Sequence, residues 1–230
     1  MDRLDQAKKM AAERAVDFVE DGMVVGLGTG STAMWAIRRL GERVKEGLNV
    51  HAIGTSSQTE ELARSLHIPL VTFAEIKELD LAIDGADEVA HDLSLTKGGG
   101  GALLREKLVA SAARRFLVII DQTKRVYHLG RFLLPVEVVP FGWELTQFRI
   151  KTQGCTAKLR ILGDHEEPYV SDNGNYILDC DFKEIADPRS LHRDLKALPG
   201  VVETGLFIDM VYAVIESDGV DVSVEYKGLG

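Results

Sequence analysis

Residues 23–45 read Met-Val-Val-Gly-Leu-Gly-Thr-Gly-Ser-Thr-Ala-Met-Trp-Ala-Ile-Arg-Arg-Leu-Gly-Glu-Arg-Val-Lys, and they predict a strand, a turn and a helix in succession. The strand covers 23–28 and the helix 33–45, with Ser31 or Thr32 as a natural N-cap. Apolar residues recur at helical spacing at Ala33, Ile37, Leu40 and Val44. A Gly/Ser/Thr turn that opens a helix offers N–H groups, hydroxyls and a positive dipole end, which together suit a phosphate monoester.

This turn does not fit the common nucleotide sites. Residues 26–31 follow G-x-G-x-G-S rather than G-x-G-x-x-G, and the second predicted strand, 50–53, ends in Gly-Thr-Ser-Ser where a ribose-binding acid is expected. No Gly-Lys-Ser/Thr follows, which excludes a nucleotide P-loop. The pattern therefore favours a small phosphorylated ligand over a dinucleotide.

Outward from this unit, the first half of the chain alternates strand and helix. Strands are predicted around Val24, Val50, Leu70, Leu81 and Leu117. That alternation predicts an α/β fold, a Rossmann-like and mostly parallel sheet with helices on both faces.

The pattern changes after residue 133. Strands and helices are predicted in the order βαββαβ, at 136–139, 143–151, 157–162, 176–180, 191–198 and 201–206. This order describes a smaller ferredoxin-like α+β domain. We therefore expect a Rossmann-like catalytic domain of residues 1–130 and about 207–230, and a ferredoxin-like domain of residues 131–206.

Acidic residues follow a short apolar strand at 79–83. The sequence continues Asp84-Gly85-Ala86-Asp87-Glu88, so that the acids lie at the carboxyl end of a core strand, where open α/β sheets bind ligands. Two carboxylates three residues apart can share one site and supply an acid beside a base. The sequence leaves open whether Asp84 or Asp87 is the acid.

A glycine run, Lys97-Gly98-Gly99-Gly100-Gly101, precedes a predicted helix at 102–114. Ordering glycine is entropically costly, so such a run is expected where backbone N–H groups approach a ligand closely. The predicted apolar stripe of the helix contains Leu104, Leu108 and Ala112. Glu106 falls off that stripe, and we expect it to face the glycine run.

These motifs together resemble the type A ribose-5-phosphate isomerases, as do Leu-Pro-Val-Glu-Val at 134–138, Asp-Asn-Gly-Asn at 172–175 and residues 199–207. The resemblance covers nearly the whole chain in order. It implies an aldose-ketose isomerase of the non-oxidative pentose phosphate pathway, without cofactor or metal, that forms a dimer or tetramer. The chain departs from the family at Gly101, where many relatives carry alanine, and its tail from residue 208 matches weakly.

The resemblance also implies site residues. Glu106 would be the proton-transferring base, with Asp84, Asp87 and Lys97 assisting in catalysis. The substrate would contact Thr29, Gly30, Ser31, Thr32, Asp84, Gly85, Ala86, Asp87, Lys97, Gly98, Gly99, Gly100 and Lys124.

The chemistry agrees with these roles. Moving a proton between C2 and C1 through an enediolate requires one base that reaches both carbons, and a carboxylate suits this. Lys97 and the N–H groups of Gly98–Gly100 would stabilise the charge that grows on O1 and O2. Opening of the furanose ring needs a second proton-transfer group, for which Asp84 and Asp87 are the candidates.

Composition limits the other classes of function. The 230 residues carry a net charge of −9, which disfavours nucleic acid and anionic membranes as partners, so positive potential must be local, at Lys97, Lys124 and Lys8. The six histidines and two cysteines show no metal-ligand spacing, and no metal site is expected. The start of the chain does not read as a signal peptide, which predicts a cytoplasmic protein.

Two other functions compete with isomerisation. A sugar-phosphate-binding sensor would use the same loops without reaction, but it would usually carry a basic helix-turn-helix and could dispense with Glu106. Among enzymes of the same fold group, an amino-sugar phosphate deaminase would be expected to use a histidine near its acid/base pair. A coenzyme A transferase would need a nucleophilic glutamate and a larger chain. Neither pattern is evident in the sequence.

Overall fold

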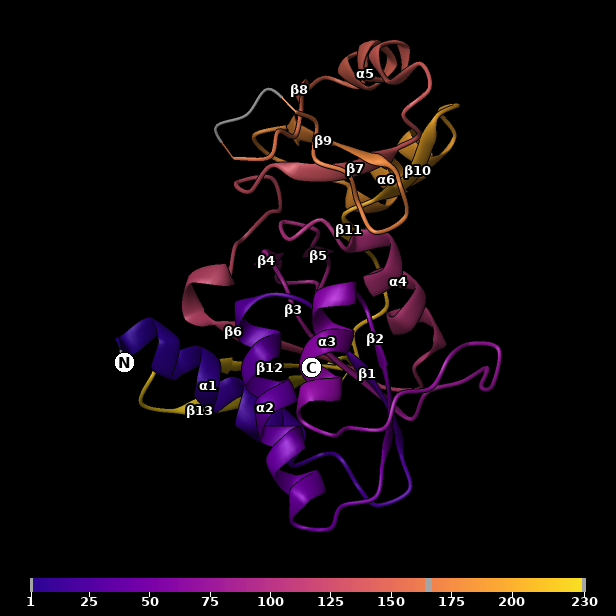
Figure 1. The fold of residues 1–230 in the computed structure, drawn as a ribbon. Coiled ribbons are helices and arrows are strands. Elements are labelled where there is room, and N and C mark those ends of the chain that lie inside the picture. The colour runs from indigo at the N-terminus through magenta and orange to yellow at the C-terminus, as the bar shows by residue number, and fades with distance from the viewer. Residues whose placement is uncertain (1, 164–166, 229–230) are drawn as a thin grey trace. The chain divides into compact units, whose positions relative to one another are not determined.

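The computed structural model describes residues 2–163 and 167–228, which form two compact units (Figure 1). The first unit takes in the chain up to residue 86, residues 105–124 and the chain from residue 210. The second takes in residues 87–104 and 125–209. The predicted domains, with boundaries at 130 and about 207, stay a prediction; the two compact units divide the chain differently at 87–104, 125–130 and 207–209. Strand pairing between β5 (Leu95–Thr96) and β11 (Leu206–Phe207) accounts for the first of these.

The first unit is built on a six-stranded sheet in the order β13-β12-β6-β3-β1-β2. Its strands are β1 (Val24–Leu27), β2 (His51–Gly54), β3 (Leu81–Gly85), β6 (Phe116–Asp121), β12 (Ala213–Ser217) and β13 (Val222–Tyr226). All pairings are parallel except that of the edge strand β13 with β12. Every residue of β6 is buried, as expected for a parallel strand covered on both faces. The predicted Rossmann-like sheet is confirmed.

Four helices accompany this sheet: α1 (Arg3–Val16), α2 (Ser31–Lys45), α3 (Ser57–Ser65) and α4 (Leu103–Ala112), within which the boundary between the units falls. Asp2 caps α1 by accepting a hydrogen bond from Asp5 N, and Ser56 caps α3 in the same way from Thr59 N. Helix α1 packs on α2 and against β6 and β12. A short 3₁₀ helix, η1 (Gln122–Lys124), follows β6.

The second unit contains a four-stranded antiparallel sheet in the order β10-β7-β9-β8. Its elements are β7 (Leu134–Val138), α5 (Trp143–Lys151), β8 (Thr156–Leu159), β9 (Tyr176–Asp181), α6 (Pro188–Lys196) and β10 (Val201–Thr204). The βαββαβ order and the strand order together are ferredoxin-like, as predicted. A three-stranded sheet of β11, β5 and β4 (Glu88–Val89) completes the unit.

Three local predictions were wrong. Helix α2 begins at Ser31, and its N-cap is Gly30 at φ 102°, so neither predicted hydroxyl residue caps it. The segment around Leu70 makes only an isolated bridge to Ala52 instead of a strand. The buried face of α4 is also not the predicted stripe, because Leu108 is 53% exposed whereas Val109 and Ala110 are buried.

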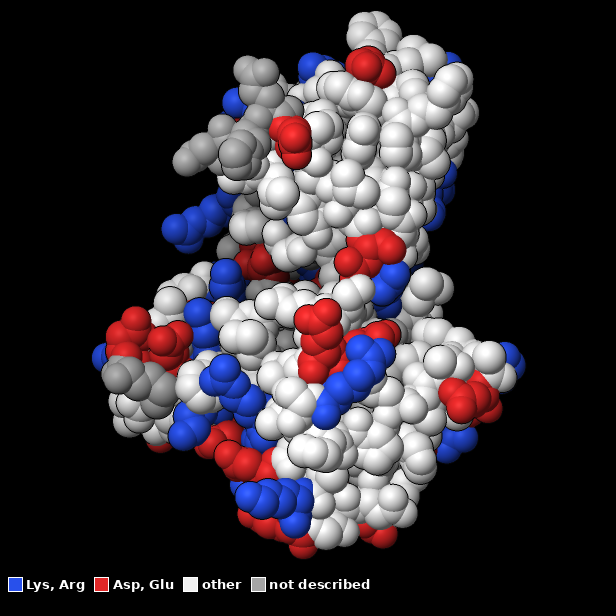
Figure 2. Space-filling model, viewed as in Figure 1, with Lys and Arg blue, Asp and Glu red and all other residues white. Residues whose placement is uncertain are grey.

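On the face shown in Figure 2, lysine, arginine and acidic side chains are interspersed over the first unit and are sparser on the second. Among the residues that the structure describes, no helix combines the length and the apolar character needed to cross a membrane.

Candidate active site

Asp84 lies at the carboxyl end of β3, beside the end of β1. It is 3% exposed, and its Oδ1 accepts hydrogen bonds from Thr29 N (3.1 Å) and Gly85 N (2.7 Å). Gly28 N donates to Ile83 O at 2.9 Å, which brings the turn after β1 against β3. Two predicted site residues, Thr29 and Asp84, are therefore bonded to each other in the first unit.

The Thr29 hydroxyl turns inward toward hydroxyl groups that lie between β2 and α3 and in the first turn of α3. We call the residues of this group the hydroxyl cluster: Thr29, Thr55, Ser56 and Thr59. The Thr29 Oγ1 lies 2.7 Å from Thr55 Oγ1 and donates to Ser56 Oγ at 2.9 Å. Thr59 Oγ1 donates to Gly28 O at 2.8 Å. Sequence analysis missed Thr55, Ser56 and Thr59, whose only signal was a Ser/Thr-rich turn after a strand.

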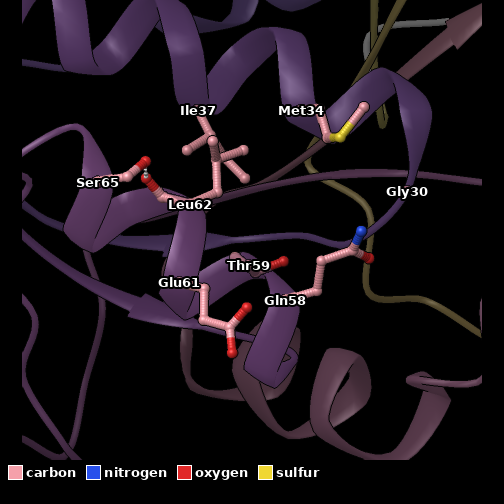
Figure 3. A pocket seen from close by; sticks show the side chains of 8 residues that line it. All are labelled: Gly30, Met34, Ile37, Gln58, Thr59, Glu61, Leu62 and Ser65. Atoms are coloured by element: carbon pink, nitrogen blue, oxygen red, sulfur yellow. Dashed lines mark hydrogen bonds between the residues drawn. The ribbon is translucent and has the colours of Figure 1, made fainter.

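The remaining residues of this turn face outward to different degrees. Gly30 and Ser31 are exposed, and Thr32 is half-buried. A cavity of about 330 Å³ adjoins Gly30 between α2 and α3 (Figure 3). It is lined by Gly30, Met34, Ile37, Gln58, Thr59, Glu61, Leu62 and Ser65. Of the predicted site residues only Gly30 reaches this cavity, so we do not place the chemistry there.

Glu106 lies on the buried face of α4 and is 5% exposed. One turn later on that face, Val109 packs on β1 so closely that a Cβ at Gly26 would lie 2.4 Å from Val109 Cγ1. The helix of a parallel crossover runs back along the strands, so Glu106 lies nearer than Val109 to the carboxyl edge of the sheet. Asp84 and Thr29 lie at that same edge.

Lys124 ends η1 immediately after β6 and is half-buried. Asp121, which is buried, shapes this turn because its Oδ1 accepts hydrogen bonds from Thr123 N (3.0 Å) and the Thr123 hydroxyl. Lys124 thus also follows the carboxyl end of a central strand. Lys8, on α1, lies 3.9 Å from Asp5.

In the second unit, Lys97 precedes the glycine turn, which we define as Gly98–Gly101. Lys97 is 3% exposed, its N–H donates to Gly205 O at 2.8 Å, and its Nζ lies 5.4 Å from the centre of the Phe207 ring. Gly101 N donates to Gly98 O at 2.9 Å, and both residues have positive φ, 84° and 100°. Glycine tolerates that backbone conformation without steric cost.

Asp87 binds the glycine turn directly, because its Oδ2 accepts a hydrogen bond from Gly99 N at 2.7 Å. The fit is close, since a Cβ at Gly99 would lie 2.6 Å from Asp87 Oδ1. Asp84 and Asp87, although three residues apart, therefore bind different turns. Their sharing of one site stays a prediction.

Glu88 has a structural role that sequence analysis did not anticipate. It is buried, and it accepts hydrogen bonds from Phe132 N (2.7 Å), Gly130 N (2.9 Å) and Thr96 Oγ1 (3.2 Å). This carboxylate ties the loop at 130–132 to β4 and β5. Among the described residues, no group of three or more His, Cys, Asp or Glu side chains is arranged to hold a metal ion.

Known proteins of one family are similar to this chain. Residues 51–219 match the family model of ribose 5-phosphate isomerase A (phosphoriboisomerase A). A ribose-5-phosphate isomerase A of Bacillus mycoides is 52% identical over 204 residues, covering 88% of this chain and 91% of the relative. A second ribose-5-phosphate isomerase A, from Oceanobacillus iheyensis, is 52% identical over 216 residues, which cover 94% of this chain and 96% of the relative.

Solved structures give the same result. Ribose 5-phosphate isomerase A from Methanocaldococcus jannaschii superposes with a TM-score of 0.91 at 42% identity, over 96% of this chain and 98% of that one. A D-ribose-5-phosphate isomerase in complex with phospho-erythronic acid superposes with a TM-score of 0.94 at 37% identity, over 98% of this chain and 100% of that one. The matches span nearly the full length of both chains in each comparison. The chain therefore belongs to the ribose 5-phosphate isomerase A family.

Proposed function

We propose that this chain interconverts D-ribose 5-phosphate and D-ribulose 5-phosphate by proton transfer through an enediolate, with Glu106 as the base. Membership of an isomerase family supports the reaction. The position of Glu106 is the observation on which the assignment of the base depends. Its carboxylate is 5% exposed and lies on the face of α4 that packs on β1, toward the edge of the sheet where Asp84 and Thr29 lie. Water is largely excluded there, which strengthens electrostatic interactions with a developing charge.

The proton transfers balance as follows. In the open-chain aldose, Glu106 takes the proton from C2, the C2–H electrons form the C1–C2 double bond, and the C1 carbonyl electrons move to O1. The O2 proton passes to O1, the C2 carbonyl forms, and protonated Glu106 returns its proton to C1. One carboxylate serves both carbons, and the reaction needs no redox partner.

Charge on O1 and O2 would be stabilised by Lys97 and by the N–H groups of Gly98, Gly99 and Gly100. A buried ammonium group interacts more strongly with an oxyanion than a solvated one does. The positive φ of Gly98 and Gly101 supports a turn that curls its N–H groups toward a ligand. Phospho-erythronic acid, the compound in complex with one structural relative, carries a carboxylate that resembles a planar enediolate beside a sugar-phosphate chain.

The other assignments belong to the same proposal. Asp84 or Asp87 assists ring opening, and Gly85 and Ala86 between them contact the sugar. The turn at 29–32 and Lys124 hold the phosphate. The two compact units act as a Rossmann-like catalytic domain and a ferredoxin-like domain. We further propose that the enzyme is cytoplasmic and works as a homodimer or tetramer without cofactor, metal, nucleic acid or membrane.

The test is conversion of ribose 5-phosphate by the purified chain in the presence of a chelator, with ketose formation followed over time. We expect turnover in wild type and a loss of about 10²–10⁴-fold in kcat for Glu106→Gln, the range that acid–base catalysis supplies. Binding of phospho-erythronic acid to Glu106→Gln should change less than about threefold, since the variant keeps the shape of the side chain.

Glu78→Gln is the matched control, because Glu78 is an exposed carboxylate of the same unit that pairs with Arg114. It should retain wild-type rates. Absence of ketose in wild type would favour the sugar-phosphate sensor. A Glu106→Gln rate above about a tenth of wild type would remove Glu106 from its role.

A further inference from the structure

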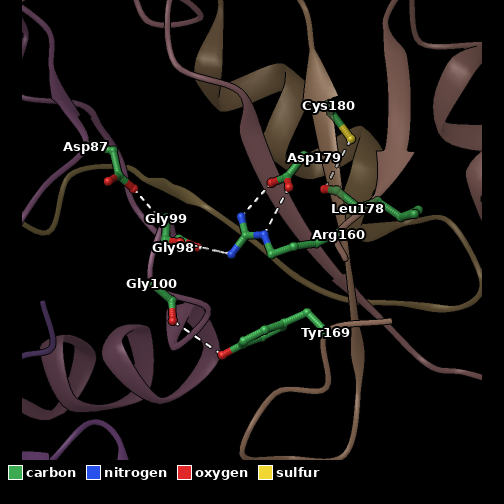
Figure 4. A network of polar contacts seen from close by, with 9 residues as sticks. All are labelled: Asp87, Gly98, Gly99, Gly100, Arg160, Tyr169, Leu178, Asp179 and Cys180. Carbon is green, nitrogen blue, oxygen red and sulfur yellow. Dashed lines mark hydrogen bonds and ion pairs between the residues drawn. The ribbon is translucent and has the colours of Figure 1, made fainter. Parts of the chain in front are cut away.

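The carbonyl oxygens of the glycine turn are bonded by two side chains that the proposed function does not use (Figure 4). Arg160 Nη1 donates to Gly98 O at 3.0 Å and to Gly99 O at 3.1 Å. The Tyr169 hydroxyl donates to Gly100 O at 3.3 Å. Three consecutive carbonyl groups are therefore held by residues that lie far later in the chain.

Arg160 is itself held in a fixed orientation. Its Nε donates to Asp179 Oδ2 at 2.9 Å and its Nη2 to Asp179 Oδ1 at 2.5 Å, a two-point contact that matches the planar guanidinium to the carboxylate. The two side chains are 15% and 20% exposed. The guanidinium also lies 5.8 Å from the centre of the Tyr169 ring.

The sheet places this ion pair away from the core of the second unit. Asp179 pairs across the strands with Lys158, and Ala157 pairs with Cys180, so Asp179 points to the opposite face from the buried Cys180. Arg160 follows β8 by one residue, and its N–H donates to Ile177 O at 2.8 Å. The paired strands β8 and β9 thus present the ion pair to the glycine turn.

Bonding a carbonyl fixes the N–H group of the next residue as well. The peptide unit is planar and trans, so its C=O and N–H point in opposite directions, and no cis bond is found among the described residues. With Gly98 O and Gly99 O turned toward Arg160, the N–H groups of Gly99 and Gly100 point away from it. Gly99 N–H accordingly donates to Asp87. A cation on the carbonyl side also polarises these peptides and strengthens their N–H groups as donors.

We propose that Arg160 and Asp179 are positioning residues of the isomerase, which orient the peptide planes of the glycine turn. In this orientation the Gly99 N–H group faces Asp87, and the Gly100 N–H group faces the enediolate oxygens. This inference rests on the proposed role of the glycine turn in the reaction. Glycine has no side chain to restrict its torsion angles, so four in a row need an external constraint to hold one arrangement.

The test compares Arg160→Met, Arg160→Lys and Asp179→Asn with Lys196→Met. Lys196 forms a partly buried ion pair with Glu203 in the same unit, at 3.2 Å, and does not contact the glycine turn. Measured quantities are kcat, KM for ribose 5-phosphate, the Kd of phospho-erythronic acid and the melting temperature. Misplaced oxyanion donors typically reduce kcat by about 10²-fold, so Arg160→Met should lose about 10–100-fold in kcat and in affinity for phospho-erythronic acid.

Three further results are expected. KM should change less than about threefold, since the ground-state sugar makes weaker use of these N–H groups than the charged intermediate does. Arg160→Lys should recover part of the loss, because an ammonium group reaches one carbonyl but not both together with Asp179. Asp179→Asn should act in the same direction as Arg160→Met, and Lys196→Met should keep the wild-type kcat.

Either of two results overturns the inference: a kcat for Arg160→Met or Asp179→Asn within about threefold of wild type, or a loss in kcat that a lowered melting temperature alone accounts for. If Arg160→Met does not fold, Asp179→Asn and Arg160→Lys decide the question. The amide ¹H–¹⁵N shifts of Gly99 and Gly100 give a readout independent of turnover: unchanged shifts in these variants reject the positioning role. Failure of the proposed function itself would appear separately, as a wild type without isomerase activity.

Discussion

Gly28 and Asp84 fit together without room for one more carbon atom. A Cβ at Gly28 would lie 2.0 Å from Asp84 Oδ1, 2.2 Å from its Cγ and 2.6 Å from its Cβ. Asp84 is buried and held by Thr29 N and Gly85 N, so it cannot swing aside without losing both hydrogen bonds. The second glycine of the Gly-Leu-Gly-Thr-Gly turn is therefore required by the carboxylate on the neighbouring strand.

Gly28→Ala should accordingly displace Asp84. We expect a loss of about 1–3 kcal/mol in the free energy of unfolding, the usual cost of overpacking, with a marked fall in kcat. The check is a double-mutant cycle measured by denaturant unfolding. In an Asp84→Gly background all three of these Asp84 atoms are removed, and the cost of Gly28→Ala should shrink by more than half. Equal costs in both backgrounds would contradict the proposed clash.

The turn after β1 contains two hydroxyl side chains with opposite orientations. Thr29 points into the hydroxyl cluster, whereas Ser31 is exposed at the start of α2. Thr29→Val should therefore cost about 0.5–1.5 kcal/mol of stability, because it removes the hydrogen bonds to Thr55 and Ser56, whose hydroxyls keep other partners, and KM should change little since Thr29 N–H remains. Ser31→Ala should raise KM without lowering the melting temperature. Kinetics combined with thermal unfolding separates the two cases.

How far the sequence predicts this fold can be judged from β1 and α4. The strand, turn and helix at 23–45 were predicted within two residues, because an unbroken apolar run, glycines and helical periodicity are all local signals. Helix α4 was predicted, but its buried face was not. Leu103, Leu104, Leu108 and Val109 surround the helix, so periodicity does not select a face, and packing of Val109 on Gly26 decides it.

The candidate site shows the same division between local and tertiary signals. Glycine and acidic motifs are local, and they predict Asp84, Asp87, Lys97 and Glu106 as site residues, which stays a prediction. Arg160 and the hydroxyl cluster were not found, because each contacts its partner across a long stretch of chain. Their signal in the sequence is an ordinary arginine after a strand and a Ser/Thr-rich turn. A single sequence does not show such long-range pairings.

Neighbouring acids of the Asp-Gly-Ala-Asp-Glu motif should respond differently to neutralisation. Glu88 is buried and accepts three hydrogen bonds, two of them from backbone N–H groups. Glu88→Gln removes its charge and sets an amide NH₂ against one of these donors, so it should cost about 1.5–3 kcal/mol of stability. Asp87→Asn should instead lower kcat while the melting temperature stays near that of wild type. Calorimetry and steady-state kinetics on the two variants check this contrast, and the reverse pattern would contradict it.

Two thiols in the second unit should titrate apart. The neighbouring Cys180 thiol lowers the pKa of Cys155, although partial burial opposes the shift. The interaction with Cys155, together with burial, raises the pKa of Cys180, whose Sγ–H donates to Leu178 O at 3.6 Å. Because the thiolate is the nucleophile, Cys155 should react with iodoacetamide at a lower pH than an ordinary thiol, and Cys180 should stay unmodified in the folded protein.

The alkylation rate as a function of pH, with the modified residue identified by mass spectrometry, tests this assignment. Cys180→Ala removes the neighbouring thiol, so the midpoint for Cys155 should move to higher pH. A midpoint that does not move in Cys180→Ala would show that Cys180 does not control the Cys155 thiolate.

Gly101 fits the position of Tyr169. Gly101 has a φ of 84°, and a Cβ there would lie 2.2 Å from the Tyr169 hydroxyl oxygen. Gly101→Ala should therefore push the tyrosine away from Gly100 O, disturb the glycine turn and lower kcat. The positive φ adds a conformational cost of about 1 kcal/mol, because the new residue has a side chain. Tyr169→Ala alone removes one 3.3 Å hydrogen bond and should have a smaller effect.

The double variant Gly101→Ala/Tyr169→Ala decides between steric and backbone causes. If the clash dominates, the second substitution restores much of the kcat lost by the first, and the two changes are strongly non-additive. If the backbone conformation dominates, the losses add, because an alanine at φ 84° remains strained whatever stands opposite it. Restoration would mean that glycine at 101 and tyrosine at 169 form a matched pair, in which the tyrosine occupies the space that a Cβ at position 101 would fill.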